Sequence, residues 1–567
     1  MIRDDLKRLV AAAIERAAER GDLPAVAMPE IVLEHPARLE LGDFATNVAL
    51  RLQRSVGRPP REVAGAITHH LELPPSVSAV EVAGPGFVNF FLADAWLQEQ
   101  VDAILAAGPE YGKLPLGNGQ SVQVEFVSAN PTGPLHVGTA RNAALGDTLC
   151  RLLQATGHAV QREYYINDAG SQTQALGASV LARYRQAHGI DAEMPASGYE
   201  GEYVAELAQG IDATHGDALL GVSDEAALTE IGPQVERIVL RWIERDLADL
   251  GVTFDRWYSE RTLYEGDLFQ TVLQKLRDGG HVVERDGAVW FASSELGEDR
   301  DNVLVRSNGQ PTYFASDIAY HYEKLALRGF DRVIDVWAAD HHGHVARMKA
   351  VLGALGIDPN RLTILLYQLV KLFKDGQELK MSKRAGNYVS VRELIDEVGA
   401  DAARFFLIQR SSDVTMNFDM NLARQSSDEN PVYYVQYAHA RTASIFREAQ
   451  TKLGGSLGGA IEYADGDPHL LTGESELRLI RKLLLFPEIV ESATLTLAPH
   501  QLPFYLQELA GAFSAFYRDC PVLPPRNPDL ALTKARLKLV ATTRQVLASG
   551  LDLIGVSAPE RMAERPA

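Results

Sequence analysis

The sequence has very few cysteines and no long apolar run. Only Cys150 and Cys520 occur among 567 residues, which excludes a disulfide scaffold and a four-cysteine zinc site and favours a reduced, cytoplasmic compartment. No apolar stretch is long enough to cross a bilayer, so we expect no membrane partner. Residues 1–7 are charged and predict an amphipathic helix rather than a signal sequence.

The sequence also lacks an excess of positive charge. The chain has 55 basic and 75 acidic residues, a formal charge of −20, which argues against a uniformly cationic nucleic-acid binder. Any RNA contact must then use local basic stripes. The length of 567 residues predicts three or four domains, and we find no internal repeat and no low-complexity tract.

A strand–loop–helix–strand unit is the first strong pattern. Residues 122–126 alternate apolar and polar side chains and predict a strand with one face more buried than the other. Leucines at helical spacing follow over residues 145–153, Gly157 stands where a helix would end, and residues 160–166 predict a second strand. Such a unit places its loop and helix start at the carboxyl edge of a parallel sheet, where phosphates bind.

The loop of this unit reads Pro134-Leu135-His136-Val137-Gly138-Thr139. A helix start leaves backbone N–H groups unpaired and carries partial positive charge, so it stabilises an anion. His136 adds a donor, and Gly138 has no Cβ to hold a flat ligand away. The alternative interpretation is an ordinary surface histidine before a helix.

A second segment, residues 370–387, predicts a hairpin followed by a basic loop. Asp375-Gly376 is a strong hairpin signal, and the hairpin delivers Lys380 and Lys383 onto a loop. Two ammonium groups can stabilise the charge that develops on departing pyrophosphate. The alternative is a solvated basic turn.

These two segments together resemble the paired signatures of class I aminoacyl-tRNA synthetases, and specifically of arginyl-tRNA synthetases. The likeness extends nearly from end to end, over residues 128–136, 164–168, 313–320, 430–441 and 550–562. It implies a Rossmann-like parallel-sheet catalytic domain, a small amino-terminal α/β domain and a carboxyl-terminal all-α helical bundle. It also implies arginine–tRNA ligase activity that uses ATP with Mg²⁺ and needs tRNA for its first step.

By this resemblance His136, Lys380 and Lys383 are the catalytic residues. The ATP-binding residues implied by the resemblance and the sequence pattern are Pro134, His136, Gly138, Thr139, His341, His344, Lys380, Met381, Ser382 and Lys383. Thr139 stands where the family usually has a second signature histidine; it can donate a hydrogen bond but carries no charge. Loss of one transition-state donor costs on the order of 100- to 1000-fold in rate, so activity is either weakened or compensated.

Candidate arginine-binding residues follow from charge. A guanidinium is always protonated and presents a planar fork of donors, so its site needs carboxylates. The resemblance assigns Glu125, Asp317 and Tyr313 to the guanidinium and Asn130 to the α-amino group, with Asp340 as a weaker contact. Tyr313 and Asp317 form an i, i+4 pair at a predicted helix start. The alternative is a structural helix-capping acid and a packed aromatic.

Two rival functions remain open. Asp340, His341 and His344 follow a strand-like segment and could ligate zinc or manganese in a metal-dependent phosphoesterase, although further acidic ligands are lacking. On the synthetase interpretation we expect no zinc. The other rival is a tRNA-binding paralogue with weakened chemistry, which Thr139 supports and the other retained site residues oppose.

The chain divides by pattern into three expected domains. These are residues 1–115, an α/β domain that the family uses to contact the tRNA elbow; 116–400, the catalytic domain with a helical insertion at about 175–285; and 401–567, an α-helical anticodon-binding domain. We expect the catalytic strands to resume around residues 288–291 and the chain to be helical beyond about Ala400.

A mixture of aromatic and basic side chains follows Pro431, which suits a first helical position. The candidate tRNA-binding residues are Tyr433, Tyr437, His439, Arg441 and Arg447. Unpaired bases are bound by stacking and hydrogen bonding, with cations on the phosphates. The alternative is that about half of these aromatics are core. The expected partners are tRNA(Arg), L-arginine and ATP, and we expect a monomer.

Overall fold

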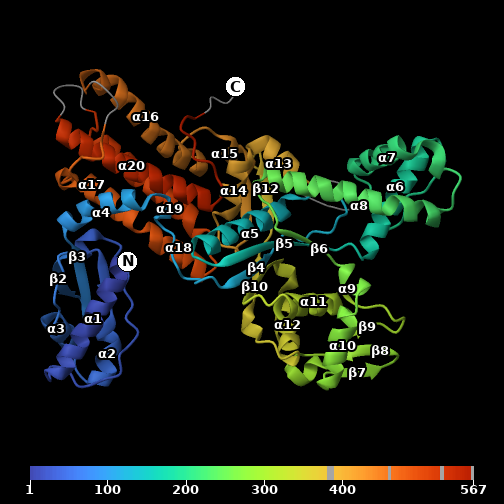
Figure 1. Cartoon of the computed structure of the whole chain (residues 1–567), viewed down its shortest axis with the longest axis horizontal. Coiled ribbons are helices and arrows are strands. Elements are labelled where there is room, and N and C mark those ends of the chain that lie inside the picture. Colours follow the sequence, from blue (N-terminus) through green and yellow to red (C-terminus); the bar gives the residue numbers. More distant parts are fainter. Residues whose placement is uncertain (380–387, 458–461, 524–528, 563–567) are drawn as a thin grey trace.

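The amino-terminal unit is a small antiparallel sheet covered by helices. The computed structural model describes residues 1–379, 388–457, 462–523 and 529–562. The elements of this unit are α1 (Ile2–Glu19), β1 (Phe44–Thr46), α2 (Val48–Val56), α3 (Pro60–His69), β2 (Val77–Ala83), β3 (Phe87–Leu92) and α4 (Asp94–Ala107). The strand order is β1-β3-β2, and the turn expected between residues 82 and 92 joins β2 to β3. In Figure 1 the unit lies beneath the carboxyl-terminal helices.

A five-stranded parallel sheet forms the centre of the molecule. Its order is β11-β10-β4-β5-β6, from β4 (Ser121–Glu125), β5 (Ala159–Ile166), β6 (Arg256–Ser259), β10 (Arg332–Ala338) and β11 (Leu362–Tyr367). Helix α5 (Val137–Ala155) connects β4 to β5, which confirms the predicted strand–helix–strand unit. β4 is buried on both faces, including Gln123 and Glu125, because parallel strands are covered on both sides.

The helical insertion is shorter than expected. Helices α6 (Ser171–Ala187), α7 (Glu202–His215) and α8 (Asp224–Asp249) project together to one side of the sheet. β6 then pairs with β5 at the sheet edge, so the chain returns to the sheet near residue 256 and not near 285. β6 spans four residues and begins with Arg256, so it lacks the apolar run by which a buried strand is recognised.

The strands around residues 288–291 belong to a separate sheet. β7 (Val282–Arg285), β8 (Ala288–Phe291) and β9 (Asn302–Val305) form a small antiparallel sheet of their own. The helices of this lobe are α9 (Thr262–Glu265), α10 (Leu268–Asp278), α11 (Tyr313–Tyr322) and α12 (His342–Ala354), and one π-helical turn, η5 (Glu323–Leu327), continues α11. The lobe lies below the central sheet in Figure 1.

The predicted hairpin is present. β12 (Val370–Lys374) and β13 (Gln377–Glu378) pair antiparallel across Asp375 and Gly376, whose φ angles of 52° and 74° suit a type I′ turn. The chain is not purely helical beyond Ala400, because β14 (Met416–Asp419) pairs in parallel with β12. A four-residue strand set among helices leaves little trace in the sequence pattern.

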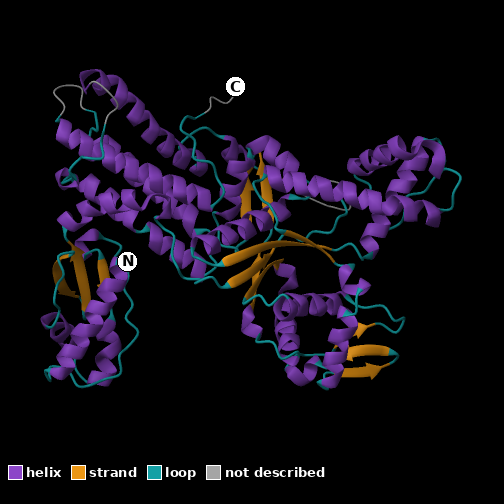
Figure 2. Cartoon of the chain, in the orientation of Figure 1, coloured by secondary structure: helices purple, strands orange, loops and turns teal. Residues whose placement is uncertain are grey.

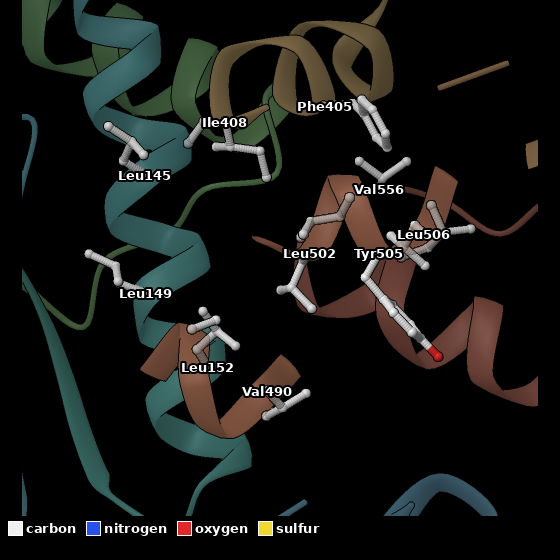
Figure 3. Packing of buried hydrophobic residues seen from close by; sticks show 14 of the residues in the cluster. Leu145, Leu149, Leu152, Phe405, Ile408, Val490, Leu502, Tyr505, Leu506 and Val556 are labelled. Atoms are coloured by element: carbon white, nitrogen blue, oxygen red, sulfur yellow. The ribbon is translucent and has the colours of Figure 1, made fainter. Parts of the chain in front are cut away.

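The last third is otherwise helical (Figure 2). Its helices are α13 (Val391–Val398), α14 (Ala400–Ile408), α15 (Met420–Arg424), α16 (Pro431–Leu457), α17 (Glu474–Leu484), α18 (Phe486–Leu495), α19 (Gln501–Asp519) and α20 (Leu530–Leu553). Pro431 occupies the first position of α16, as predicted. Leu145, Leu149 and Leu152 of α5 face the apolar side chains of α14 and α18 in a shared core (Figure 3).

The predicted fold class is therefore confirmed: a Rossmann-like parallel sheet, a small α/β unit before it and a helical bundle after it. Within the described residues, none of the helices combines the length and the apolar character needed to cross a bilayer.

Candidate active site

The loop after β4 has a strained backbone. Val127 and Ser128 adopt φ angles of 68° and 40°, in the left-handed region that β-branched residues rarely enter. The Val127 N–H donates to Oδ1 of Asn142 (2.7 Å), and the Asn142 amide donates to the Val336 carbonyl (2.9 Å). Asn142 therefore ties β4, α5 and β10 together where the parallel strands end. Such strain is typical of functional sites.

His136 is the N-cap of α5, at the helix start that the sequence predicted. Its Nδ1 accepts a hydrogen bond from the Thr139 N–H at 3.4 Å. Thr139 is buried within the first turn of the helix. Pro134 and Gly138 flank the same turn. The four predicted residues Pro134, His136, Gly138 and Thr139 thus lie together at one helix start, which carries partial positive charge.

The second predicted segment, Lys380, Met381, Ser382 and Lys383, lies outside the described residues. The chain that follows it is placed beside the helix start. The Val137 N–H donates to the Val389 carbonyl (3.2 Å), the Val391 N–H donates to the Leu135 carbonyl (2.8 Å), and His136 forms a bridge with Ser390. Two segments about 250 residues apart therefore meet at the start of α5, and the pairing of the two motifs stays a prediction.

A cavity of about 640 Å³ opens at the carboxyl ends of the central strands. It contains six of the predicted site residues, namely Glu125, Asn130, Tyr313, Asp317, His341 and His344. Asp340 is not among its lining residues; it lies on the turn before α12 with a side chain that is 80 % exposed. His136 and its neighbours also lie outside this lining, at the adjacent helix start.

The lining residues come from separate elements. Tyr313 and Asp317 lie on the first turns of α11, which begins at Tyr313 after the capping Thr312, as predicted. Tyr313 is 52 % exposed. Asn130 lies in the loop after β4, and its amide donates to Oε1 of Gln172 on α6 (2.7 Å).

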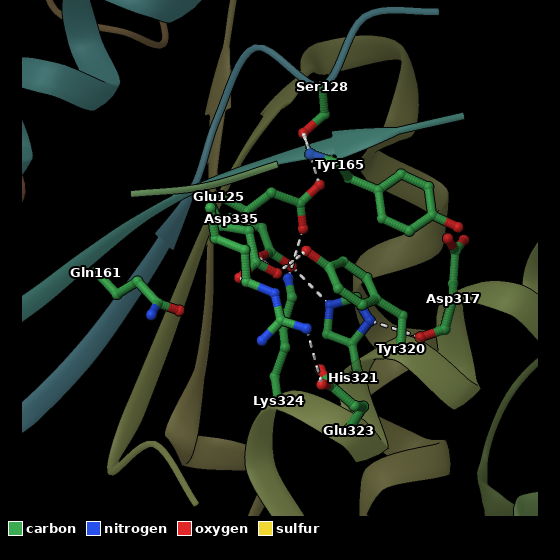
Figure 4. A network of polar contacts seen from close by, with 12 residues as sticks. Glu125, Ser128, Gln161, Tyr165, Asp317, Tyr320, His321, Glu323, Lys324 and Asp335 are labelled. Atoms are coloured by element: carbon green, nitrogen blue, oxygen red, sulfur yellow. Dashed lines mark hydrogen bonds and ion pairs between the residues drawn. The ribbon is translucent and has the colours of Figure 1, made fainter. Parts of the chain in front are cut away.

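Glu125 is held by two donors (Figure 4). Its Oε1 accepts from the Ser128 hydroxyl at 2.9 Å, and its Oε2 accepts from the ammonium of Lys324. Lys324 also donates to Oδ1 of Asp335 (3.0 Å), and Nε2 of His321 lies 2.6 Å from the other oxygen of Asp335. Glu125 therefore belongs to a buried network of alternating charge.

Sequence reasoning missed Ser128, His321, Lys324 and Asp335. One signal was present: Asp317, His321 and Lys324 are spaced i, i+4 and i+7 and so share one helical face. A charged helical face is ordinarily taken as solvated, and here it is buried, with Lys324 at 0 % exposure.

The cavity side of this network has surplus negative charge. Burial raises the pKa of Asp317 to about 7; His321 opposes this shift and Glu125 and Glu260 add to it. Burial likewise raises the pKa of Glu125, although Lys324 opposes the shift. A cation entering the cavity would relieve both effects, and a planar cation could donate hydrogen bonds to both carboxylates.

The pKa of Asp335, which does not line the cavity, is shifted in the opposite direction. Burial acts to raise the pKa of Asp335, but Lys324 and His321 outweigh it and lower the value to about 2. The pKa of Lys324 is raised despite burial, because Asp335 and Glu125 surround it. Asp335 and Lys324 thus form a buried ion pair in which both groups are charged, whereas Asp317 and Glu125 line the cavity.

A second cavity, of about 420 Å³, lies on the helical bundle. It is lined in part by Tyr437, Arg441 and Arg447 of α16. The Arg441 guanidinium lies 4.7 Å from the ring centre of Tyr437 and 5.0 Å from that of Tyr517. The rings of Tyr433 and Tyr437 stack at 6.0 Å.

His439 does not join this surface. It is buried, and its Nδ1 lies 2.9 Å from the carbonyl oxygen of Pro559, so it packs the carboxyl-terminal segment onto α16. Burial lowers its pKa. The expectation that His439 contacts RNA does not fit this position, because helical aromatics that face the core are not available to a ligand.

The histidine-rich segment after β10 was the basis of the rival metal hypothesis. His341 and His344 lie with ring centres 5.7 Å apart at the mouth of the cavity. Burial lowers the pKa of His344, and Arg347 adds to this effect. Over the parts of the chain that the structure describes, no three or more His, Cys, Asp or Glu side chains gather in a group that could hold a metal ion.

Comparison with known proteins gives consistent matches along the whole chain. Residues 4–92 match the arginyl tRNA synthetase N terminal domain, residues 100–446 match the class I (R) tRNA synthetase catalytic domain, and residues 435–562 match the DALR anticodon binding domain. An arginine–tRNA ligase of Dehalococcoides mccartyi is 48 % identical over 550 residues, covering 97 % of each chain. That of Carboxydothermus hydrogenoformans is 47 % identical over 554 residues, covering 98 % of each. The Thermus thermophilus arginyl-tRNA synthetase structure aligns with a TM-score of 0.77 at 26 % identity, covering 99 % of this chain and all of that one.

Proposed function

The chain belongs to the arginyl-tRNA synthetase family and is an arginine–tRNA ligase, and we propose how its residues divide that reaction. In the first step the carboxylate of L-arginine attacks the α-phosphate of ATP, which forms arginyl-adenylate and releases pyrophosphate. In the second step a hydroxyl of the 3′-terminal ribose of tRNA(Arg) takes the arginyl group and AMP leaves. Catalysis rests mainly on positioning and on charge stabilisation.

The surplus of buried acid in the cavity is the observation that carries the arginine assignment. Asp317 and Glu125 bind the guanidinium, which supplies the positive charge that offsets these two buried carboxylates. Tyr313 borders the same end, and Asn130 holds the α-amino group at the other. Asp340 is left out of this set because its side chain points to solvent.

ATP binds across the adjacent helix start. His136 and the partial positive charge at the start of α5 hold its phosphates, and His341 and His344 contact the nucleotide from the cavity mouth. Lys380 and Lys383 follow the departing pyrophosphate. The contacts of Leu135 and Val137 with Val391 and Val389 support this assignment, because the chain that follows the basic segment lies beside this helix start. Mg²⁺ arrives with ATP and is held mainly by phosphate oxygens and water.

Transfer RNA binds two further surfaces. The aromatic and basic cavity on α16, with Tyr433, Tyr437, Arg441 and Arg447, receives unpaired anticodon bases and phosphates. The amino-terminal unit contacts the body of the tRNA. The proposal includes a cytoplasmic location and a monomeric enzyme.

Amino-acid-dependent exchange of pyrophosphate into ATP tests the proposal. Each of the twenty amino acids is assayed with and without tRNA(Arg). We expect exchange with arginine alone and only when tRNA is present. Binding of tRNA without any exchange would favour a catalytically weakened paralogue, as Thr139 suggested, and tightly bound zinc with phosphoesterase activity would favour the other rival.

Lys383→Ala sharpens the assignment of the basic segment. We expect the exchange rate to fall about 100-fold or more, because the ammonium stabilises the leaving pyrophosphate. Arginine binding should change little. Lys371→Ala, on the exposed face of β12 before the same loop, is the matched control. Equal losses in rate and in arginine affinity would contradict the role given to Lys383.

A further inference from the structure

Lys324 is a buried lysine that does not itself line the cavity. It lies on the π-helical turn η5, directly after α11, and its side chain is wholly buried. Single π-helical turns are rare and frequently mark functional sites. Its ammonium lies 4.1 Å from the ring centre of Tyr320 and donates to Glu125 and Asp335. Lys324 can therefore act on a ligand through Glu125, which lines the cavity.

The two donors on Glu125 divide its oxygens. The Lys324 ammonium donates a hydrogen bond to Oε2, and the Ser128 hydroxyl donates one to Oε1. Ser128 is itself fixed, because its Oγ accepts from the Tyr165 N–H at 3.1 Å. Each carboxylate oxygen accepts two hydrogen bonds, so one acceptor position remains on each oxygen. That pair of positions matches the two parallel N–H groups of a guanidinium fork.

We propose that Lys324 is a positioning residue for arginine recognition, which holds Glu125 as a carboxylate of fixed orientation at the cavity wall. This inference rests on the proposed function, since it names the residue that prepares the arginine site. Without the ammonium, Glu125 would face Asp335 and Asp317 across a buried space. It would then take up a proton or rotate, and either change removes the acceptor pair that a guanidinium needs.

The first test is Lys324→Met. We expect the arginine KM in the exchange assay to rise about 10- to 100-fold, the range for loss of a charge-assisted hydrogen bond, while the ATP KM stays within twofold. The arginine KM of the variant should also improve more steeply with rising pH than that of the wild type. The groups that face Glu125 in this titration are Lys324, His321, Asp335 and Asp317.

A second variant separates positioning from stability. Lys324→Met/Asp335→Asn removes the ammonium together with the acid left opposite it, so the folded protein no longer buries that unpaired charge. We expect its thermal midpoint to recover relative to Lys324→Met while its arginine KM stays high. Recovery of both together, or an arginine KM equal to that of the wild type, would overturn the inference.

Lys538→Met is the matched control. Lys538 is also a buried lysine and pairs with Asp102 at 2.6 Å, but it lies in the helical bundle. Its loss should lower the thermal midpoint and leave the arginine KM unchanged. Wild-type exchange distinguishes the two possible failures. Its absence with arginine would contradict the proposed function itself, whereas arginine-specific exchange with an unaffected Lys324→Met would contradict only the role of Lys324.

Discussion

Lys324 and Arg404 are both buried cations, and their surroundings differ in one respect. Arg404 of α14 is 1 % exposed and donates to the Asp147 carboxylate and to the carbonyls of Ile554 (2.9 Å) and Leu250 (3.1 Å). Asp147 also pairs with Arg151 (2.8 Å) and Arg162 (3.4 Å). Basic groups outnumber acids there, whereas around Lys324 the acids outnumber the lysine.

This difference in the balance of charge shifts the pKa values of the carboxylates in opposite directions. Burial acts to raise the pKa of Asp147, but Arg404 and Arg151 outweigh it and the pKa is lowered. Asp317 keeps a raised pKa because its burial, to which Glu125 and Glu260 add, outweighs the opposing effect of His321. Removing one partner of a buried ion pair destabilises the fold because it leaves an unpaired buried charge, whereas a buried charge that lacks a partner beside a cavity is a candidate for ligand binding. The comparison therefore separates structural ion pairs from binding groups.

The largest effect should come from breaking the structural pair. Asp147→Asn leaves the Arg404 guanidinium buried with only carbonyl partners, which costs about 3–5 kcal/mol. We expect a clear fall in the thermal midpoint and an unchanged arginine KM in the protein that remains folded. Asp552→Asn is the control: Asp552 pairs with the same Arg151 but is 83 % exposed, so the midpoint should barely change. An unchanged thermal midpoint in Asp147→Asn would show that the buried pair of Arg404 and Asp147 is not needed for stability.

Asp317→Asn should show the opposite pattern. Loss of the carboxylate removes a charge-assisted contact to the guanidinium, so the arginine KM should rise about 10- to 100-fold. The thermal midpoint should stay level or increase, because a neutral amide relieves the surplus of buried acid. Asp340→Asn, outside the cavity, serves as the control and should keep the arginine KM within twofold. A lower midpoint with a normal KM would place Asp317 among the structural acids.

The pH dependence of arginine binding follows from the same carboxyl. Asp317 has a pKa of about 7 without ligand, and a bound guanidinium favours its ionised form. Below pH 7 arginine must displace a proton, so affinity should increase about tenfold per pH unit up to pH 7 and level off above it. The titratable groups nearby are Glu125, Glu260, His321 and Asp335.

Calorimetry in buffers of different ionisation enthalpy measures this proton. About one proton should be released per arginine at pH 6, and the release should decline above pH 7. The same titration on Asp317→Asn should lose the inflection near pH 7. An affinity that is constant between pH 5.5 and pH 7 would show that Asp317 is ionised before arginine binds.

The smallest effect concerns Ser128. Ser128→Ala removes the neutral donor on Oε1 of Glu125 and keeps the Lys324 ammonium on Oε2. A neutral hydrogen bond contributes about 1 kcal/mol, so the arginine KM should rise about fivefold. If Ser128→Ala had a larger effect than Lys324→Met, the hydroxyl and not the ammonium would be the main support of Glu125.

Features with strong local signals were predictable from the sequence. The Asp375-Gly376 turn, the start of α11 at Tyr313 and the position of Pro431 all depend on backbone preferences of a few adjacent residues. Four of the five arginine candidates, which followed from the family resemblance and from charge, line one cavity, and Asp340 does not.

Features that depend on distant partners were not predictable. Lys324 is buried because Glu125 lies opposite it from 199 positions earlier in the chain, and no local pattern contains that information. The short strands β6 and β14 are strands because a neighbouring edge is available to them. His439 illustrates the reverse case, since an aromatic stripe alone does not say which side faces the core.

The amino-terminal unit rests on the helical bundle through α4 and α17. Arg481 binds Asp43 at 2.6 Å, and the amide of Gln98 donates to the carbonyls of His469 and Leu471. The first and last regions of the chain are consequently joined into one arm, although more than 350 residues separate them. A nucleic acid that touches both regions meets them at a distance set by the protein, so the second contact forms at high effective concentration once the first is made.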